Sequence, residues 1–320
     1  MPLPTDEHTL SLSRDLIGVL DKIGGGVHPG FRPAHAKGIL LSGTFIPSAE
    51  AAKLTCAPHA RSGSTTPVTV RFSDSSGLPD VSDNDGTKAS PRGIAIRFHL
   101  GEHVHTDVIG HSTNGFPVRT PEEFLEFLRA ASESGPTAAK PTPVEKFVGS
   151  HPAALKFVTT PKPVPTSFAR EAFFGVTALK FIGEDGTAKF GRFRVRPQLG
   201  TEYLDDHAAA ANGPNFLFEE LAARVAKGPI QFDLLVQVAN AGDVADDATV
   251  QWPDDRPIVN FGTVVLKAVE PDSKSEEQRI IFDPIPRVDG IESSGDPLLE
   301  VRASVYLMSG RRRRSGSTSL

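Results

Sequence analysis

An arginine and a tyrosine near the C-terminus stand four residues apart in a segment with helical signals. Arg302 and Tyr306 therefore share one face of the expected helix. A tyrosine oxygen binds a ferric ion only as the phenolate, whereas a free phenol has a pKa of about 10, and a guanidinium within hydrogen-bond reach favours the phenolate. The pair could form a metal-ligand unit, or it could be a surface arginine stacked on a boundary tyrosine. Tyr203, the other tyrosine of the chain, has no arginine at helical spacing.

The residues before this pair favour the metal-ligand alternative. The stretches that lead up to it resemble, in order and spacing, the proximal haem segment of the catalase family: Phe282-Asp283-Pro284, Gly290-Ile291-Glu292-Ser293, then Arg302 and Tyr306. The resemblance implies that Tyr306 is the axial ligand of a haem iron, as tyrosine is in catalase. It also implies that Arg302 supports the phenolate.

Further segments resemble the same family, in the family's order. They are Arg32 to Gly38, Val70 to Ser73, Pro91 to Phe98, and Gln251-Trp252-Pro253 followed by Gly262 and Val265. The resemblance reaches from about residue 28 to residue 314 and implies a small catalase-related peroxidase. It implies haem b as the cofactor. No NADPH is expected, because this chain ends almost at the proximal helix and lacks the C-terminal extensions of large catalases.

The resemblance assigns further roles to single residues. His35 maps onto the distal base, and Ser73 onto the residue that hydrogen-bonds its ring. Cleavage of a peroxide needs a group that takes a proton from one oxygen and returns it to the other, which an imidazole near its own pKa does. The family positions that bind the cofactor fall on Arg32, Arg71, Phe72 and Arg313, with the arginines matching partners of the haem propionates. Arg313 lies in a run of four arginines, and a neighbour could serve in its place.

One stretch departs from the family pattern. Large catalases have a distal asparagine within a Gly-Asn-Asn-Thr-Pro stretch, where this chain reads Gly-His-Ser-Thr-Asn-Gly-Phe over residues 110–116. An ungapped alignment places His111 at the asparagine position, and Asn114 follows three residues later. We expect either His111 or a rearranged Asn114 to be the second distal polar group, with a slight preference for His111.

A cluster of histidines suggests an alternative hypothesis, a metal site without haem. The side chains of His103 and His105 would point to the same face of a strand. With His99, His111 and a carboxylate from Asp107 or Glu102 they could build a non-haem metal site in a β-barrel. Two alternatives remain on the haem side, namely a lyase or isomerase of fatty-acid hydroperoxides and a haem carrier without activity. A distal base at His35 is not needed by a carrier.

Composition sets the broad limits. The chain has 320 residues, a formal charge of −5 and a single cysteine, which excludes an intrachain disulfide and a cysteine-based metal site. The mild acidity argues against nucleic acid as a partner. The first residues do not read as a signal peptide, and no stretch approaches a membrane span. The chain is thus expected in the cytoplasm, with a small peroxide and an organic reductant as partners and a homodimer as the default assembly.

The elements that would position these residues are mostly strands. We expect an amphipathic helix over 11–23, strands over 38–46, 68–72 and 93–100, and a helix over 121–131 capped by Thr120. Further on we expect strands over 173–182, 188–196, 230–238 and 258–268, a hairpin turn at 183–186, a helix over 216–226, and a last helix from Asp296 to Gly310. The fold class is α+β, an antiparallel β-barrel of the catalase type with flanking helices. The divisions are 1–27 (helix and linker), 28–314 (haem-binding core) and 315–320 (disordered tail).

Overall fold

Antiparallel strands wind into a closed barrel in the computed structural model, which describes residues 3–316 and 318. In the described part of the chain eight strands close the barrel, because β8 pairs with β7 as well as with β9. These strands are β1 (Gly38–Pro47), β2 (Thr66–Ser73), β3 (Gly93–Gly101), β4 (Val104–His111), β5 (Phe173–Phe174), β7 (Ala188–Pro197), β8 (Ile230–Val238) and β9 (Ile258–Val269). Two short strands, β6 (Leu179–Ile182) and β10 (Ile291–Ser293), extend the sheet beyond β7. The expected fold class is confirmed.

The barrel interior is filled by the inward-facing residues of each strand. On β2, Val70 and Phe72 are fully buried in this core, and the ring of Phe72 packs against Phe168, Phe173 and Phe232. Since successive side chains of a strand point to opposite faces, Arg71 and Ser73 leave the other side of the wall. The functional residues of β2 therefore face away from the barrel core.

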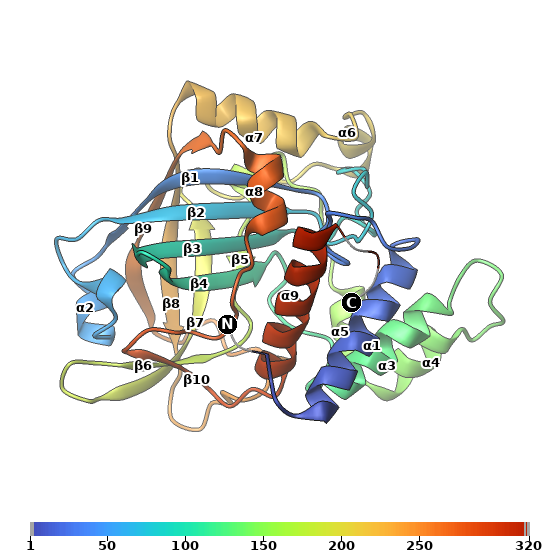
Figure 1. The fold of residues 1–320 in the computed structure, drawn as a ribbon, viewed down its shortest axis with the longest axis horizontal. Coiled ribbons are helices and arrows are strands. Elements are labelled where there is room, and N and C mark those ends of the chain that lie inside the picture. Colours follow the sequence, from blue (N-terminus) through green and yellow to red (C-terminus); the bar gives the residue numbers. More distant parts are fainter. Residues whose placement is uncertain (1–2, 317, 319–320) are drawn as a thin grey trace.

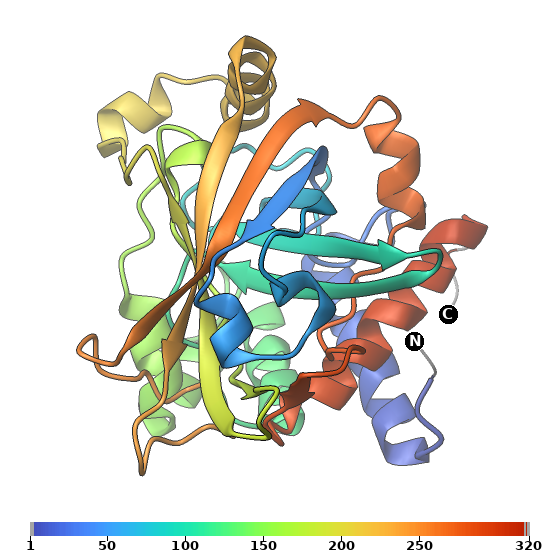
Figure 2. The same cartoon turned by 90° about the vertical axis from the view of Figure 1, so that its left-hand side faces the viewer.

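Helices cover the outside of this wall. The helix α9 (Leu298–Ser315) lies beside the barrel, and α1 (Glu7–Ile23) packs against both α9 and α3 (Pro121–Ser132), as Figures 1 and 2 show. Apolar residues of the three helices form a second core of Leu12, Leu16, Val19, Leu125, Leu128 and Val301. The remaining helical segments are α2 (Ala51–Leu54), α4 (Pro143–Ser150), α5 (Pro152–Thr159), α6 (Asp206–Ala210), α7 (Phe216–Lys227), α8 (Ser273–Arg279) and the 3-10 turns Pro58–Ala60 and Phe168–Arg170.

Local sequence signals place most elements correctly. Thr120 and Glu123 form the reciprocal capping box that starts α3. The hairpin at 183–186 joins β6 to β7. The expected strand over 173–182 is two strands, β5 and β6, separated by residues 175–178. The helix α8 had no counterpart among the expected elements.

The expected end of the last helix at Gly310 is wrong. The helix α9 continues to Ser315 and is followed by Gly316 in the left-handed conformation. A Cβ on Gly310 would lie 2.3 Å from side-chain atoms of Ile281, so the glycine allows close packing inside the helix instead of ending it. The continuation places Arg313 on α9, two turns after Tyr306. Of the expected tail, residues 315–320, Ser315 belongs to α9, and residues 317, 319 and 320 lie outside the described residues.

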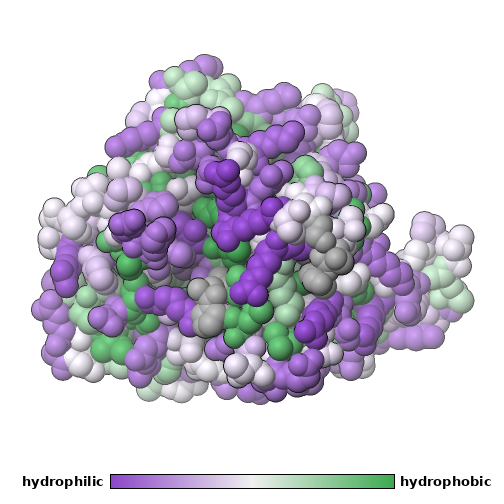
Figure 3. Space-filling model, in the orientation of Figure 1, coloured by the Kyte–Doolittle hydropathy of each residue, from purple (hydrophilic) through white to green (hydrophobic). Residues whose placement is uncertain are grey.

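The face drawn in Figure 3 is mainly hydrophilic, with hydrophobic side chains in small groups between. Among the described helices, none is both long enough and apolar enough to span a bilayer.

One buried polar side chain stands out in the barrel core. His59 is fully buried, its ring lies 4.7 Å from that of Phe98 and 5.6 Å from that of Phe261, and neither ring nitrogen has a hydrogen-bond partner. Burial lowers the pKa of His59 from 6.5 to about 4. The imidazole is therefore neutral in the folded chain at neutral pH.

The folded state should lose stability in mild acid through His59. The unfolded chain binds a proton at this residue below its ordinary pKa of about 6.5, whereas the folded chain resists it down to about 4. Stability is fully present above pH 6.5 and is lost as the pH falls toward 4. We predict that His59→Leu reduces the difference in unfolding free energy between pH 7 and pH 5 by about 2 kcal/mol, measured by urea denaturation. His207→Leu, at an exposed position of α6, is the control. Equal pH dependence in wild type and His59→Leu would contradict the assignment.

Candidate functional site

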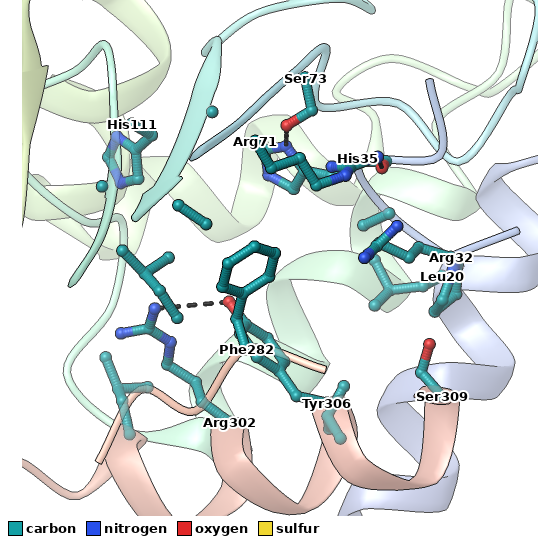
Figure 4. Close-up of a pocket in the computed structure, with 18 of the residues that line it drawn as sticks. Leu20, Arg32, His35, Arg71, Ser73, His111, Phe282, Arg302, Tyr306 and Ser309 are labelled. Carbon is teal, nitrogen blue, oxygen red and sulfur yellow. Dashed lines mark hydrogen bonds between the residues drawn. The ribbon is translucent and has the colours of Figure 1, made fainter. Parts of the chain in front are cut away.

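A cavity of about 280 Å³ lies between the outer face of the barrel wall and the helices α1, α3 and α9. Figure 4 shows His35 and Ser73 on one side of it and Tyr306, rising from α9, on the other. Most of the remaining wall is apolar and comes from Leu16, Leu20, Ile94, Ile109, Phe116, Phe124, Phe174, Val176, Phe282, Leu298, Val301 and Val305. Polar groups are thus concentrated at two opposed faces and at one end.

His35 is held in an unusual backbone conformation. Its φ of 56° falls in the left-handed region, which a non-glycine residue adopts at a cost of about 1 kcal/mol or more. The main chain is fixed on both sides, since the His35 amide donates to the Ser75 carbonyl (2.9 Å) and Arg71 donates to the His35 carbonyl (2.9 Å). The ring Nδ1 lies 3.0 Å from the Ser73 hydroxyl oxygen. This arrangement leaves Nε2 as the ring nitrogen available to a molecule in the cavity.

His35 is a neutral base in this setting. Loss of hydration in the cavity wall, and then the positive charge of Arg71, lower the pKa of His35 from 6.5 to about 3. A neutral imidazole accepts a proton from a bound acid, and its low pKa favours giving that proton away again. The pair of His35 and Ser73 is therefore suited to moving one proton between two nearby atoms.

The opposite face presents the tyrosine. Arg302 donates to the Tyr306 hydroxyl oxygen at 3.4 Å, and its guanidinium carbon is 5.8 Å from the centre of the tyrosine ring. A second guanidinium nitrogen donates to Thr177 at 3.2 Å, which orients the arginine from the barrel side. Both side chains line the cavity, so the alternative of an ordinary surface pair does not describe them.

Three arginines meet at one end of the cavity. Arg32 and Arg71 each donate to the same carboxylate oxygen of Glu277, both at 2.8 Å. Arg313 reaches the same place from α9 and donates to the Ile280 carbonyl at 2.7 Å. Burial, and then the charge of Arg71, lower the pKa of Arg313 to about 10. Positive charge is in excess here, as an anion-binding site requires.

The structure separates the two candidates for the second distal group. His111, the last residue of β4, lines the cavity, whereas Asn114 does not, and the main-chain carbonyl of Asn114 accepts a hydrogen bond from Gln251. The Thr113 amide donates to His111 Nδ1 at 3.3 Å, so the neutral ring carries its hydrogen on Nε2. That Nε2 is buried without a partner. Burial, and then the charge of Arg302, lower the pKa of His111 to about 4.

Other expected residues lie elsewhere. Phe72, expected to contact the cofactor, is inside the barrel and does not line the cavity, because Arg71 and Ser73 on either side of it take the outward face. His103 is exposed at the turn before β4, and His99 pairs across the sheet with His105. Within the described part of the chain, no group of three or more His, Cys, Asp and Glu side chains is placed to hold a metal ion. This finding removes the support for the non-haem alternative.

Sequence reasoning missed two residues of the site. A Cβ on Gly93 would lie 2.6 Å from the Ser73 hydroxyl oxygen and 2.8 Å from His35 Nδ1, so only glycine leaves room for that pair. Its position at the start of β3, inside the segment 91–98, was the available signal. Glu277 had no signal, because its contacts to Arg32 and Arg71 join segments more than 200 residues apart in the chain.

The cavity fits the cofactor that the resemblance implies. Haem is a flat apolar macrocycle with two carboxylates at one edge. The wall is apolar, a tyrosine oxygen faces one side, and three guanidiniums gather at one end. The unpartnered donor of His111 adds a polar point to the wall. The donor set is thus suited to an iron that prefers a phenolate ligand and to an acidic edge.

In a comparison with protein families, residues 30–319 match the model described as Catalase. This span includes the site residues from Arg32 to Arg313.

Comparisons with individual proteins agree. The chain is 36% identical over 292 residues to a catalase-related peroxidase of Mycolicibacterium paratuberculosis, covering 90% of this chain and 91% of that protein. It is 34% identical to a catalase-related peroxidase of Synechococcus elongatus, covering 91% and 86%. Against a catalase of Triticum aestivum it is 30% identical and spans 60% of that longer protein. Among solved structures, a fungal catalase matches with a TM-score of 0.77 at 22% identity, over 88% of this chain and 59% of that one.

The close contact at Gly93 can be tested without assuming any activity. We predict that Gly93→Ala lowers the unfolding free energy by about 1–3 kcal/mol, because the added methyl must displace the His35 ring or the Ser73 hydroxyl. The matched control is Gly18→Ala in α1, where nothing lies within 4 Å of the new Cβ. That variant should be neutral or stabilised by up to about 1 kcal/mol. Equal stability of the two variants in urea denaturation would show that Gly93 has room to spare.

Proposed function

The chain belongs to the catalase family, and on this premise we propose that it is a haem-dependent peroxidase. It reduces hydrogen peroxide or organic hydroperoxides with electrons from a small organic donor and has weak catalase activity. The observation that carries the proposal is the opposition of His35–Ser73 and Arg302–Tyr306 across one apolar cavity. The broader statement, an enzyme of the catalase and peroxidase type that acts on peroxide, follows from the family and from relatives named catalase-related peroxidase.

The cofactor site would use the middle and the C-terminal turn of α9. Tyr306 would ligate the iron as phenolate with Arg302 stabilising its charge, and Arg32, Arg71 and Arg313 would pair with the propionates. When bound, haem supplies the iron that binds the peroxide and stores two oxidising equivalents. The support is the contact of Arg302 with Tyr306 and the excess of guanidinium charge at one end of the cavity.

His35 moves the proton. Its neutral Nε2 accepts the proton of the bound peroxide and returns it to the oxygen that departs, so that water leaves as the O–O bond breaks. Ser73, at 3.0 Å from Nδ1, keeps the ring in the orientation this requires. The low pKa of His35 ensures that the base is free at neutral pH. His111 would present its Nε2 hydrogen as a second polar contact, in place of the asparagine of large catalases.

Four finer assignments complete the proposal. The haem is haem b, no nicotinamide nucleotide takes part, the protein acts in the cytoplasm, and two chains form a homodimer. Peroxidase activity is supported by the names of the relatives, which are catalase-related peroxidases.

The proposal is tested by loading the protein with haem and recording its spectrum and its reactions. We expect a Soret band in the blue, fast oxidation of small aromatic donors by peroxide, and oxygen release much slower than from a large catalase. His35→Ala should keep the haem and lose about 10²–10⁴-fold in the rate of peroxide cleavage, and Ser73→Ala should lose less. Retained turnover in His35→Ala would indicate a haem carrier or another base. Conversion of fatty-acid hydroperoxides without any donor would indicate the lyase instead.

The role of His111 can be separated from that of Asn114. His111→Ala removes a buried donor from the cavity wall and should lower kcat/KM for peroxide by about tenfold, the value of one hydrogen bond. His111→Asn restores a donor and should lose less. Asn114→Ala keeps the carbonyl that Gln251 uses and should leave kcat/KM unchanged. The opposite ranking of His111→Ala and Asn114→Ala would assign the role to Asn114.

A further inference from the structure

A single carboxylate lies among the arginines at the end of the cavity. One oxygen of Glu277, Oε2, accepts hydrogen bonds from Arg32 and from Arg71, both at 2.8 Å. The side chain is 13% exposed, and its other oxygen, Oε1, is buried with no partner. Glu277 therefore takes up donor capacity of the same guanidiniums that would hold a cofactor carboxylate.

The backbone around Glu277 is fixed by the third arginine. Arg313 donates to the main-chain carbonyls of Glu277 and Gln278, both at 3.2 Å, and to that of Ile280 at 2.7 Å. The C-terminal turn of α8 is thus bound to α9, as Figure 1 shows for the two helices. The carboxylate is built into the site and is not a mobile surface group.

The charges at this end can be counted. Three guanidiniums line the cavity here, and guanidinium stays protonated in proteins. Of their neighbours on α9, Arg312 is paired with Asp21 and Arg314 is exposed. With the single carboxylate of Glu277, the cluster carries a net charge of two positive. A ligand with two carboxylates matches that charge.

We propose that Glu277 is the internal counter-ion of the cofactor's carboxylate site: it sets the cluster of Arg32, Arg71 and Arg313 to the charge of a dicarboxylate and competes with the cofactor for two of the three guanidiniums. The inference rests on the proposed function. Glu277 stabilises the arginines when no other anion is near. Its negative charge also weakens their attraction for further carboxylates, so that the remaining positive charge matches a ligand with two carboxylates.

The substitution Glu277→Gln removes the charge and keeps an acceptor of the same shape. The cluster then gains one positive charge, so it should attract an acidic ligand more strongly at low salt, and salt should screen the gain. The haem-free protein should be less stable, because Arg32 and Arg71 lose their charged carboxylate partner. Glu276→Gln is the matched control, since Glu276 lies one residue earlier on α8 and pairs with the exposed Arg279 outside the cavity.

The experiment titrates the haem-free full chain with haemin and, in parallel, with haemin dimethyl ester, whose carboxylates are blocked. We expect Glu277→Gln to bind haemin about tenfold more tightly than wild type in low salt and about equally in 1 M salt. Glu277→Gln should bind the ester with the same affinity as wild type at both salt concentrations. The melting temperature of the haem-free protein should fall in Glu277→Gln and stay constant in Glu276→Gln.

Unchanged or weaker haemin binding by Glu277→Gln would overturn the inference. An equal gain in affinity for the ester would also overturn it, because it would indicate a purely structural role for Glu277. If haem-free Glu277→Gln does not fold, the loaded protein serves instead, and its haemin should pass to an excess of apomyoglobin about tenfold more slowly than from wild type. Loss of haemin to apomyoglobin at the wild-type rate or faster would overturn the inference equally.

The variant Glu277→Asp keeps the charge, and its haemin binding should show the salt dependence of wild type. A wild type that binds no haemin at all would refute the proposed function rather than the role of Glu277.

Discussion

The site depends on the alternation of side chains across a single layer of sheet. Along β2, Val70 and Phe72 enter the barrel, and Arg71 and Ser73 leave it on the other side. One wall thus serves two purposes: its inner face is packed with aromatic rings, and its outer face carries a cation and a hydroxyl beside a cavity. The rigidity of the packed interior is passed directly to the groups that contact a ligand. His35 itself is on a loop, but it is tied to this wall through Ser73 and through the bond from Arg71 to its carbonyl.

The cavity has neutral histidines in its wall and a cluster of positively charged arginines at one end. His35 and His111 remain neutral because burial removes their hydration and because positive charge lies nearby, mainly that of Arg71 for His35 and that of Arg302 for His111. Arg32, Arg71 and Arg313 gather at one end of the cavity, where the carboxylate of Glu277 partly balances their charge. An acidic ligand bound there would add negative charge to this cluster and would compete with Glu277 for the guanidiniums of Arg32 and Arg71.

Much of this could be predicted from the sequence, and the exceptions have physical reasons. The pair of Arg302 and Tyr306 follows from helical spacing, and the cap at Thr120 from local chemistry. The inward orientation of Phe72 follows from strand alternation, because Arg71 and Ser73 on either side of it face the cavity. Gly310 looks locally like a helix end, because glycine often follows the last turn of a helix, but its role depends on Ile281, which packs against it from another segment. Glu277 and the unpaired ring of His59 could not be found, because burial and contacts between distant segments leave no trace in a local pattern.

The helix α1 contributes to the cavity wall although it is not part of the barrel. Its residues, Glu7–Ile23, lie outside the span that matches the family, residues 30–319, yet Leu16 and Leu20 form part of the cavity wall. Substitutions at Leu16 or Leu20 would therefore reshape the cavity wall without altering any residue of the barrel. The volume open to a ligand and the groups that carry the chemistry are held by different parts of the chain, so each can be altered while the other is kept.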